Sequence, residues 1–114
     1  MAQGSEFVDF VLESLQPLRG VSARRMFGGH GIYKDGLMFA LIADDTLYLK
    51  VDDGNRPAFE AEGLRPFRYA GKGRPVRMSY YEAPSEGLDD PETLCTWARN
   101  AYGAARRARK SSRG

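Results

Sequence analysis

The sequence predicts an α+β domain in which an antiparallel sheet of about five strands, a meander followed by a hairpin, is flanked by an N-terminal and a C-terminal helix. Three observations predict this fold. An amphipathic stretch opens the chain, short strand-like runs separated by turn signals fill its middle, and a longer amphipathic stretch closes it. The expected order of elements, α-β-β-β-α-β-β-α, lacks the strict strand–helix alternation of a parallel, doubly wound sheet.

The first expected helix lies close to the N-terminus. Its apolar residues recur at the i, i+3, i+4, i+8 and i+11 spacing of an amphipathic helix. Ser5 is suited to cap its start, and Pro17 marks its end. The apolar residues are Phe7, Phe10, Val11, Leu15 and Leu18.

A three-stranded meander is expected next. Residues 24–33 and 37–43 read as strands, and Asp35-Gly36 between them is a sequence favoured in tight hairpins. Asp44-Asp45 then turns the chain into residues 46–51, in which apolar residues alternate with polar or aromatic ones. Together these runs predict three antiparallel strands.

The second half of the chain predicts a short helix, a hairpin and a long helix. Residues 56–63 form the short helix, with Phe59 as its apolar anchor. Residues 66–69 and 76–81 form the hairpin, and residues 90–92 start the last helix with a capping acid followed by proline at the first helical position. The apolar stripe of that helix consists of Leu94, Trp97, Ala98, Ala101, Tyr102 and Ala105.

Length and composition indicate one domain of 114 residues. We expect residues 1–105 to form it and residues 106–114 to be a basic, disordered tail. No run is apolar enough to span a membrane and no secretory signal opens the chain, so a cytoplasmic location is the default expectation. The single cysteine, Cys95, has no partner for an internal disulfide.

Charge is segregated along the chain. All 15 acidic residues lie at or before Glu92, so residues 1–92 carry 11 basic against 15 acidic side chains. The remaining basic residues favour non-specific binding of polyanions such as DNA, although cations near a helix C-terminus also complement its dipole. Residues 66–81 interleave basic and aromatic side chains, as nucleic-acid surfaces and half-buried sheets both do. The candidate nucleic-acid contacts are Arg99, Arg106, Arg107, Arg109, Lys110 and Arg113.

The only histidine, His30, lies in a glycine-rich stretch. Glycines at this position fit a strand entry or bulge, and a close approach of backbone to a ligand is the alternative. The stretch leads into a strand and lacks the spacing of a phosphate-binding loop. With one histidine and one cysteine far apart, the sequence predicts no catalytic triad, no metal site and no cofactor. A small-molecule binder or enzyme using His30 is a third-ranked alternative.

Several motifs resemble the N-terminal domain of the TfoX/Sxy family, bacterial regulators of natural competence. The resemblance covers roughly residues 5–105 in order. It is carried by Arg25-Met26-Phe27-Gly28-Gly29, Gly31-Ile32-Tyr33, Phe39-Ala40-Leu41-Ile42, Leu47-Tyr48-Leu49-Lys50, Met78 with Tyr80-Tyr81-Glu82-Ala83-Pro84, and Pro91 with Leu94, Trp97-Ala98 and Ala101.

This resemblance implies a curved antiparallel sheet flanked by helices, and a non-enzymatic role in transcription of DNA-uptake genes alongside a larger transcription factor. Fuller family members carry a second, helical domain, and the present sequence is expected to be the stand-alone N-terminal type. Protein partners, direct DNA binding and a homodimer formed through a sheet edge are all open at this point. The expected interaction residues are Arg25, Phe27, Gly28, Gly29, His30, Gly31, Tyr80, Tyr81 and Glu82.

Overall fold

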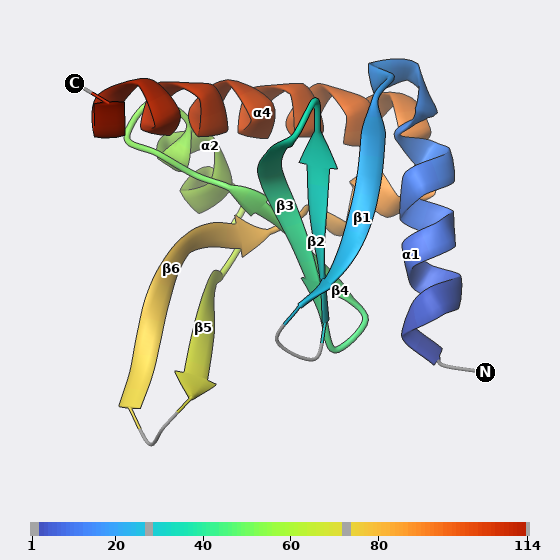
Figure 1. The fold of residues 1–114 in the computed structure, drawn as a ribbon, viewed down its shortest axis with the longest axis horizontal. Helices are drawn as coiled ribbons and strands as arrows, with labels where there is room; N and C mark the ends of the chain where they lie inside the picture. Colours follow the sequence, from blue (N-terminus) through green and yellow to red (C-terminus); the bar gives the residue numbers. More distant parts are fainter. Residues whose placement is uncertain (1–2, 27–28, 72–73, 114) are drawn as a thin grey trace.

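The computed structural model describes residues 3–26, 29–71 and 74–113, and confirms the α+β class (Figure 1). A sheet is flanked by an N-terminal helix, a long C-terminal helix and shorter helical segments. The elements are α1 Gln3–Ser14, η1 Gln16–Leu18, β1 Val21–Met26, β2 Gly29–Lys34, β3 Leu37–Ala43, β4 Thr46–Lys50, α2 Arg56–Ala61, β5 Pro66–Gly71, β6 Arg74–Glu82, α3 Ser85–Asp89 and α4 Pro91–Arg113.

The sheet has six antiparallel strands in the order β1-β2-β3-β4-β6-β5, one more than expected. The difference lies in residues 24–33, which we predicted to be one strand. The chain reverses within this stretch, so that Arg25 pairs with His30 and Met26 with Gly29. Period-two alternation continues across such a short reversal, and the sequence pattern alone therefore hides it. The predicted β5–β6 hairpin is confirmed.

Both predicted acidic turns are confirmed as two-residue hairpins. Asp35 and Gly36 have φ of 52° and 81°, and Asp44 and Asp45 have φ of 51° and 56°. Positive φ at both central residues is typical of the type I′ turn, whose twist matches that of the flanking strands. Aspartate tolerates this left-handed region better than most residues, which accounts for the Asp-Asp turn.

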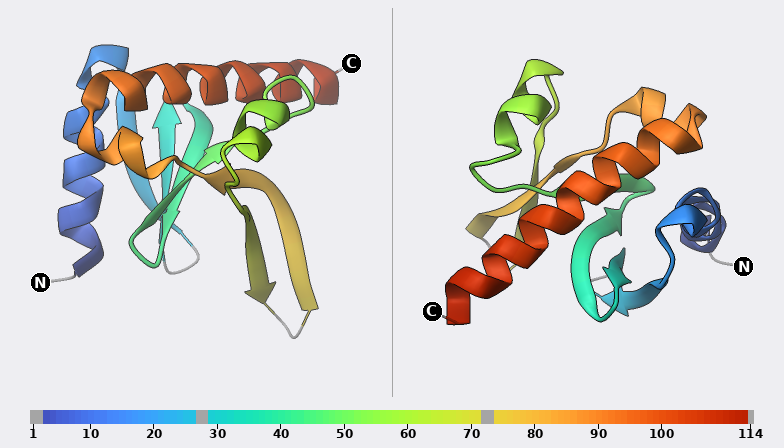
Figure 2. Two further views of the ribbon diagram at one scale, coloured as in Figure 1. Left: turned by 180° about the vertical axis from the view of Figure 1, so that it is seen from behind. Right: turned by 90° about the horizontal axis from the view of Figure 1, so that it is seen from above.

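The main core lies between the sheet and the helices. Figure 2 shows α4 crossing the molecule above the sheet, and α4 contacts β3 and β4 while α1 contacts β1. Phe59 of α2 is fully buried and meets Trp97 and Tyr81, with ring centroids 4.9 and 5.9 Å apart. The predicted apolar stripe of the last helix is confirmed because Leu94, together with the alanines that follow it on the same face, is buried.

The last helix begins as predicted but continues further. Asp90 caps it: Asp90 Oδ2 accepts a hydrogen bond of 2.7 Å from Thr93 Oγ1, and Asp90 Oδ1 accepts one of 3.3 Å from the Glu92 amide. Residues 106–113, which we had expected to form a disordered tail, continue α4 in the structure. Alanine, arginine and lysine are strong helix formers, and we underestimated their propensity in this segment.

A bidentate ion pair fastens the C-terminal half of α4 to the loop after β4. Arg107 Nε and Nη2 donate to the two carboxylate oxygens of Asp52, the second over 3.0 Å. The same carboxylate accepts the backbone amides of Gly54 and Asn55, and Asn55 in turn accepts the Asp52 amide over 2.8 Å. Chiefly through the Arg107 hydrogen bond, the pKa of Asp52 falls from 3.8 to about 2.

We predict that the Asp52→Asn variant is less stable than the wild type at neutral pH, and that this difference shrinks as the pH falls from 3.8 towards 2. A carboxylate whose folded-state pKa is lowered stabilises the fold above its unfolded pKa and loses that effect as it becomes protonated. Urea unfolding of both proteins across this pH range measures the difference. A stability gap that stays constant with pH would contradict the role of the ionised carboxylate.

Candidate interaction surface

Gly29 marks a close approach between two strands. A Cβ atom added to it would lie 2.1 Å from the carbonyl oxygen of Ile42 on β3, a backbone atom that cannot move without breaking the ladder. Glycine is therefore required by the packing of β2 on β3. The strand-entry interpretation of this glycine is supported by the geometry, and no ligand is needed to explain it.

Gly31 lies beneath two methionines. A Cβ atom at Gly31 would lie 2.7 Å from Met26 Sδ, 3.1 Å from Met38 Sδ and 3.1 Å from the ring of Tyr33. These are ends of flexible side chains, in contrast to the backbone oxygen opposite Gly29. The missing side chain lets the two thioethers settle onto the sheet, on the side away from α4.

We name this side the outer face and define it by its apolar residues. Strand alternation places Tyr48 there, because Leu47 and Leu49 on either side of it belong to the main core. The register between β2 and β3 shifts next to Ile32. Because of this shift, the adjacent β3 residues Phe39 and Ala40 both lie in the main core. The apolar residues of the outer face are Met26, Tyr33, Met38, Leu41, Tyr48, Phe67 and Tyr80.

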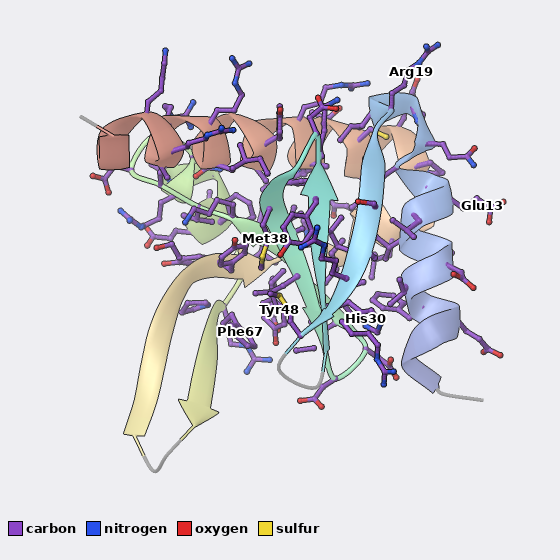
Figure 3. The ribbon with its side chains drawn as sticks, in the orientation of Figure 1. Glu13, Arg19, His30, Met38, Tyr48 and Phe67 are labelled. Carbon is purple, nitrogen blue, oxygen red and sulfur yellow. The ribbon has the colours of Figure 1, made fainter. Side chains whose placement is uncertain are left out.

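The outer face is partly covered by the curvature of the sheet. Leu41 and Tyr80 are only 7% exposed, although neither belongs to the main core. In Figure 1 the β5–β6 hairpin swings away from the first four strands, and Figure 3 shows Met38, Tyr48 and Phe67 between these two parts. The rings of Tyr48 and Phe67 meet edge to face with centroids 4.7 Å apart.

The opening left on the outer face is small. A cavity of about 30 Å³ is lined by residues that include Met26, Gly29, His30, Met38 and Phe67. This volume equals about one water molecule, so the hollow cannot enclose a metabolite. The thioethers of Met26 and Met38 and the half-exposed ring of Phe67 are instead suited to contact one apolar side chain of a partner, because the flexible methionine side chain adapts its shape readily.

Cations border the outer face. The Arg24 guanidinium lies 5.3 Å from the centre of the Tyr33 ring, and Lys50 Nζ lies 5.2 Å from that of Tyr80. Burial, with a smaller contribution from Tyr33, raises the pKa of Tyr80 to about 12. The Tyr80 hydroxyl is therefore neutral at physiological pH, and the positive charges at the rim come from Arg24 and Lys50.

Three of the expected interaction residues, Tyr80, Tyr81 and Glu82, lie on an interior strand, although we had taken them for a sheet edge. β6 lies between β4 and β5, so it is an interior strand, and Tyr80 and Tyr81 are 7% and 4% exposed. Glu82 forms an ion pair of 3.7 Å with Arg65. Adjacent aromatic residues at the end of a strand are typical both of an exposed sheet edge and of a buried strand. Here Tyr81 packs in the main core and Tyr80 packs on the outer face.

The remaining expected interaction residues vary in accessibility. Arg25 is exposed, whereas His30 is half-buried. Phe27 and Gly28 lie outside the described residues. Met38 was missed as part of the outer face; the available signal was its apolar character on a strand beside the core residue Phe39. Phe67 was expected only within the basic and aromatic stretch 66–81, as one of the rings of a nucleic-acid surface.

The predicted basic contacts gather on α4. Arg99, Arg106, Arg109 and Lys110 are exposed, and the Arg106 guanidinium lies 6.0 Å from the centre of the Tyr102 ring. Arg107 differs because Asp52 holds it. The side chain of Arg113 lies outside the described residues.

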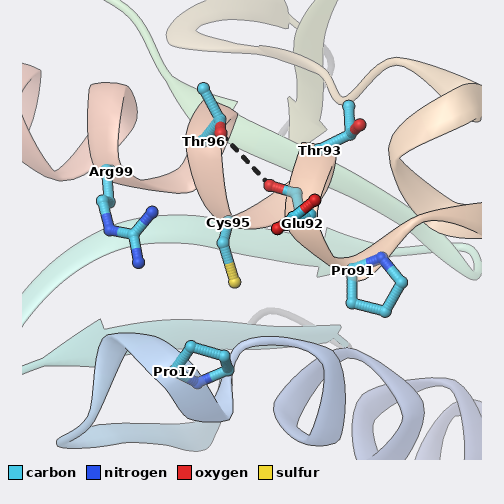
Figure 4. Close-up of a pocket in the computed structure, with 7 residues that line it drawn as sticks. All are labelled: Pro17, Pro91, Glu92, Thr93, Cys95, Thr96 and Arg99. Atoms are coloured by element: carbon cyan, nitrogen blue, oxygen red, sulfur yellow. Dashed lines mark hydrogen bonds between the residues drawn. The ribbon is translucent and has the colours of Figure 1, made fainter.

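An open groove of about 630 Å³ separates η1 from the start of α4 (Figure 4). Cys95 lies in its wall but is only 3% exposed, and its thiol donates to the Ser14 carbonyl over 3.3 Å. Burial raises the pKa of Cys95, which favours the unreactive thiol form. Within residues 3–26, 29–71 and 74–113 no cluster of three potential metal ligands occurs, and no helix there could cross a membrane.

The chain is similar in sequence to proteins of one known family. Residues 13–105 match the TfoX N-terminal domain family. One similar protein is the DNA transformation protein TfoX1 of Aliivibrio fischeri, which is 26% identical over 87 residues. The alignment covers 76% of this chain and 42% of TfoX1, so the chain spans less than half of the length of this relative.

We predict that alanine substitutions at the two glycines differ sharply in effect. Gly29→Ala should destabilise the fold by about 3 kcal/mol or more, because the new methyl group meets backbone. Gly31→Ala should cost only about 1 kcal/mol, because the methionine ends can shift. Guanidinium unfolding measures both, and equal losses at the two positions would contradict the packing described.

Proposed function

Because the chain belongs to the TfoX N-terminal domain family, we propose that it is a non-enzymatic regulatory domain that acts through protein contacts in the control of DNA-transformation genes. The similar TfoX1 is a DNA transformation protein, which supports the process. The observation that supports the mode of action is the outer face, where apolar side chains remain half-exposed on the side of the sheet that no helix of the described residues covers.

Three properties of the outer face favour a protein partner. It offers no cavity of metabolite size, only a hollow that accepts a single side chain. It contains methionines at its centre, and methionine-rich surfaces accommodate partner side chains of different shape. It is bordered by Arg24 and Lys50, which would orient an apolar anchor flanked by acidic groups.

We predict that Met38→Lys abolishes the ability of the chain to raise transcription from a DNA-uptake promoter. Lysine would place a charge in the centre of the proposed contact, and interface centres tolerate charge poorly. The measurement is a promoter–reporter assay in a bacterium that lacks its own TfoX.

The matched control is Ala61→Lys, which adds the same charge at an exposed position on α2. It should retain wild-type reporter output, and circular dichroism should show that both variants fold. Full reporter activity of a folded Met38→Lys variant would remove the outer face from the proposal. An inactive wild-type chain would argue against the regulatory role itself.

Direct binding of nucleic acid is the second candidate, favoured by the exposed cations of α4. Arg99, Arg106 and Lys110 fall on one stripe of a continuous helix, which presents them at fixed spacing to a phosphate backbone. Removing residues 106–114 is a poor test because that deletion also removes Arg107, which is part of the fold. Substitution of single charges separates the two effects.

If α4 binds DNA, the double variant Arg106→Gln/Lys110→Gln should lower the slope of log affinity against log salt by about 1.8, since each phosphate contact contributes about 0.9. Fluorescence anisotropy with a short duplex at several salt concentrations measures this slope. Arg24→Gln/Arg25→Gln is the matched control on β1, and equal slopes for the two double variants would exclude a specific role for α4.

A small-molecule binder or enzyme built on His30 has the weakest support. The hollow beside His30 has the volume of about one water molecule, and Gly29 and Gly31 are accounted for by packing. His30 itself pairs with Arg25 and Ile42 in the sheet ladder.

A further inference from the structure

The outward side of α1 carries acids around an exposed ring. The side chain at its centre is Phe10, which is 41% exposed. Among the described residues it is the large apolar side chain that is exposed to solvent. It stacks on Phe7 with ring centroids 6.2 Å apart, which holds it in place. Glu6 and Glu13 are exposed on the same side, and Figure 3 shows Glu13 pointing away from the body of the protein.

The outward side of α4 carries bases around a glycine. Gly103 lies in the middle of a helix of 23 residues, where glycine destabilises. A Cβ atom added there would approach only Arg107 Nη1, at 3.5 Å, which is ordinary contact. Its backbone has no positive φ. Nothing within the described fold therefore requires glycine, whereas a close approach from outside would.

The two helix faces have the same spacing with opposite charge. Glu6 stands four residues before Phe10, and Glu13 three residues after it. On α4, Arg99 stands four residues before Gly103 and Arg106 three residues after it. At 1.5 Å per residue, each face places its charges about 6 and about 4.5 Å from its centre.

These charges are available for an outside partner. Within the described part of the chain, no ion pair joins Glu6 or Glu13 to a base, or Arg99 or Arg106 to an acid. Arg106 lies against Tyr102, beside Gly103, so an incoming ring would meet an aromatic neighbour there.

We propose that the chain self-associates by packing α1 of one copy on α4 of a second copy. Phe10 lies over the notch at Gly103, and the two glutamates pair with Arg99 and Arg106. A second copy is the occupant because the complementary surface, with matching spacing, is present in the same chain. A two-fold dimer forms this contact twice. The inference is independent of the proposed regulatory function.

Sedimentation equilibrium of the full chain, at low and high salt, tests the proposal. The wild type should associate more tightly at low salt, since the flanking contacts are ionic. Glu6→Arg/Glu13→Arg alone and Arg99→Glu/Arg106→Glu alone should each weaken association at least about tenfold. An equimolar mixture of these two variants should associate again, because reversed α1 charges then face reversed α4 charges in one contact and native α1 charges face native α4 charges in the other.

Two further variants separate this contact from effects on folding. Gly103→Ala should raise the melting temperature of the chain, since alanine favours helix, and yet weaken association at least about tenfold. Glu62→Arg/Asp89→Arg makes the same charge change as the α1 variant on other exposed sites and should associate as the wild type does. A monomeric wild type, a mixture that stays monomeric, or unaltered association of Gly103→Ala would each overturn the proposal.

Discussion

The close contact of β2 with β3 at Gly29 admits only glycine and determines how tightly the first strands of the sheet pack. The backbone of β3 approaches to a distance that no side chain at this position would permit. With Gly31 also lacking a side chain, Met26 and Met38 cover the strand. The sheet thereby carries apolar contacts on both faces, although helices cover only one of them. This arrangement leaves the outer face as the surface most suited to a partner.

The two charged helices, α1 and α4, pack on the sheet with their apolar sides and differ in how they are fixed. α1 contacts β1 and leaves its acidic side free, whereas α4 spans the molecule and is tied near its far end through Asp52. Fixing α4 at both ends keeps its basic side chains on a rigid support. Electrostatic effects of the protein therefore arise from defined positions on a helix, where we had expected a disordered tail.

The sequence predicts the fold more completely than the site, for physical reasons. Local signals are strong at the Asp35-Gly36 turn, at the Asp90 cap and along the buried stripe of α4, and each is confirmed. The reversal inside residues 24–33 and the burial of Tyr80 and Tyr81 depend on which strands become neighbours. Met38 was missed for the same reason, because only the folded sheet brings it over Gly31.

Apolar residues on both faces of β3 have a consequence for the unfolded chain. The segment Leu37–Ala43 contains no charged residue, proline or glycine, and so has the composition of sequences that associate into cross-β structure. It is protected in the folded protein because it pairs on both sides, with β2 and β4. Asp35 before it and Asp44-Asp45 after it place acidic residues at both ends of the segment, where such charges oppose aggregation. The acidic turns that shape the meander thus also oppose aggregation of the unfolded chain during synthesis and refolding.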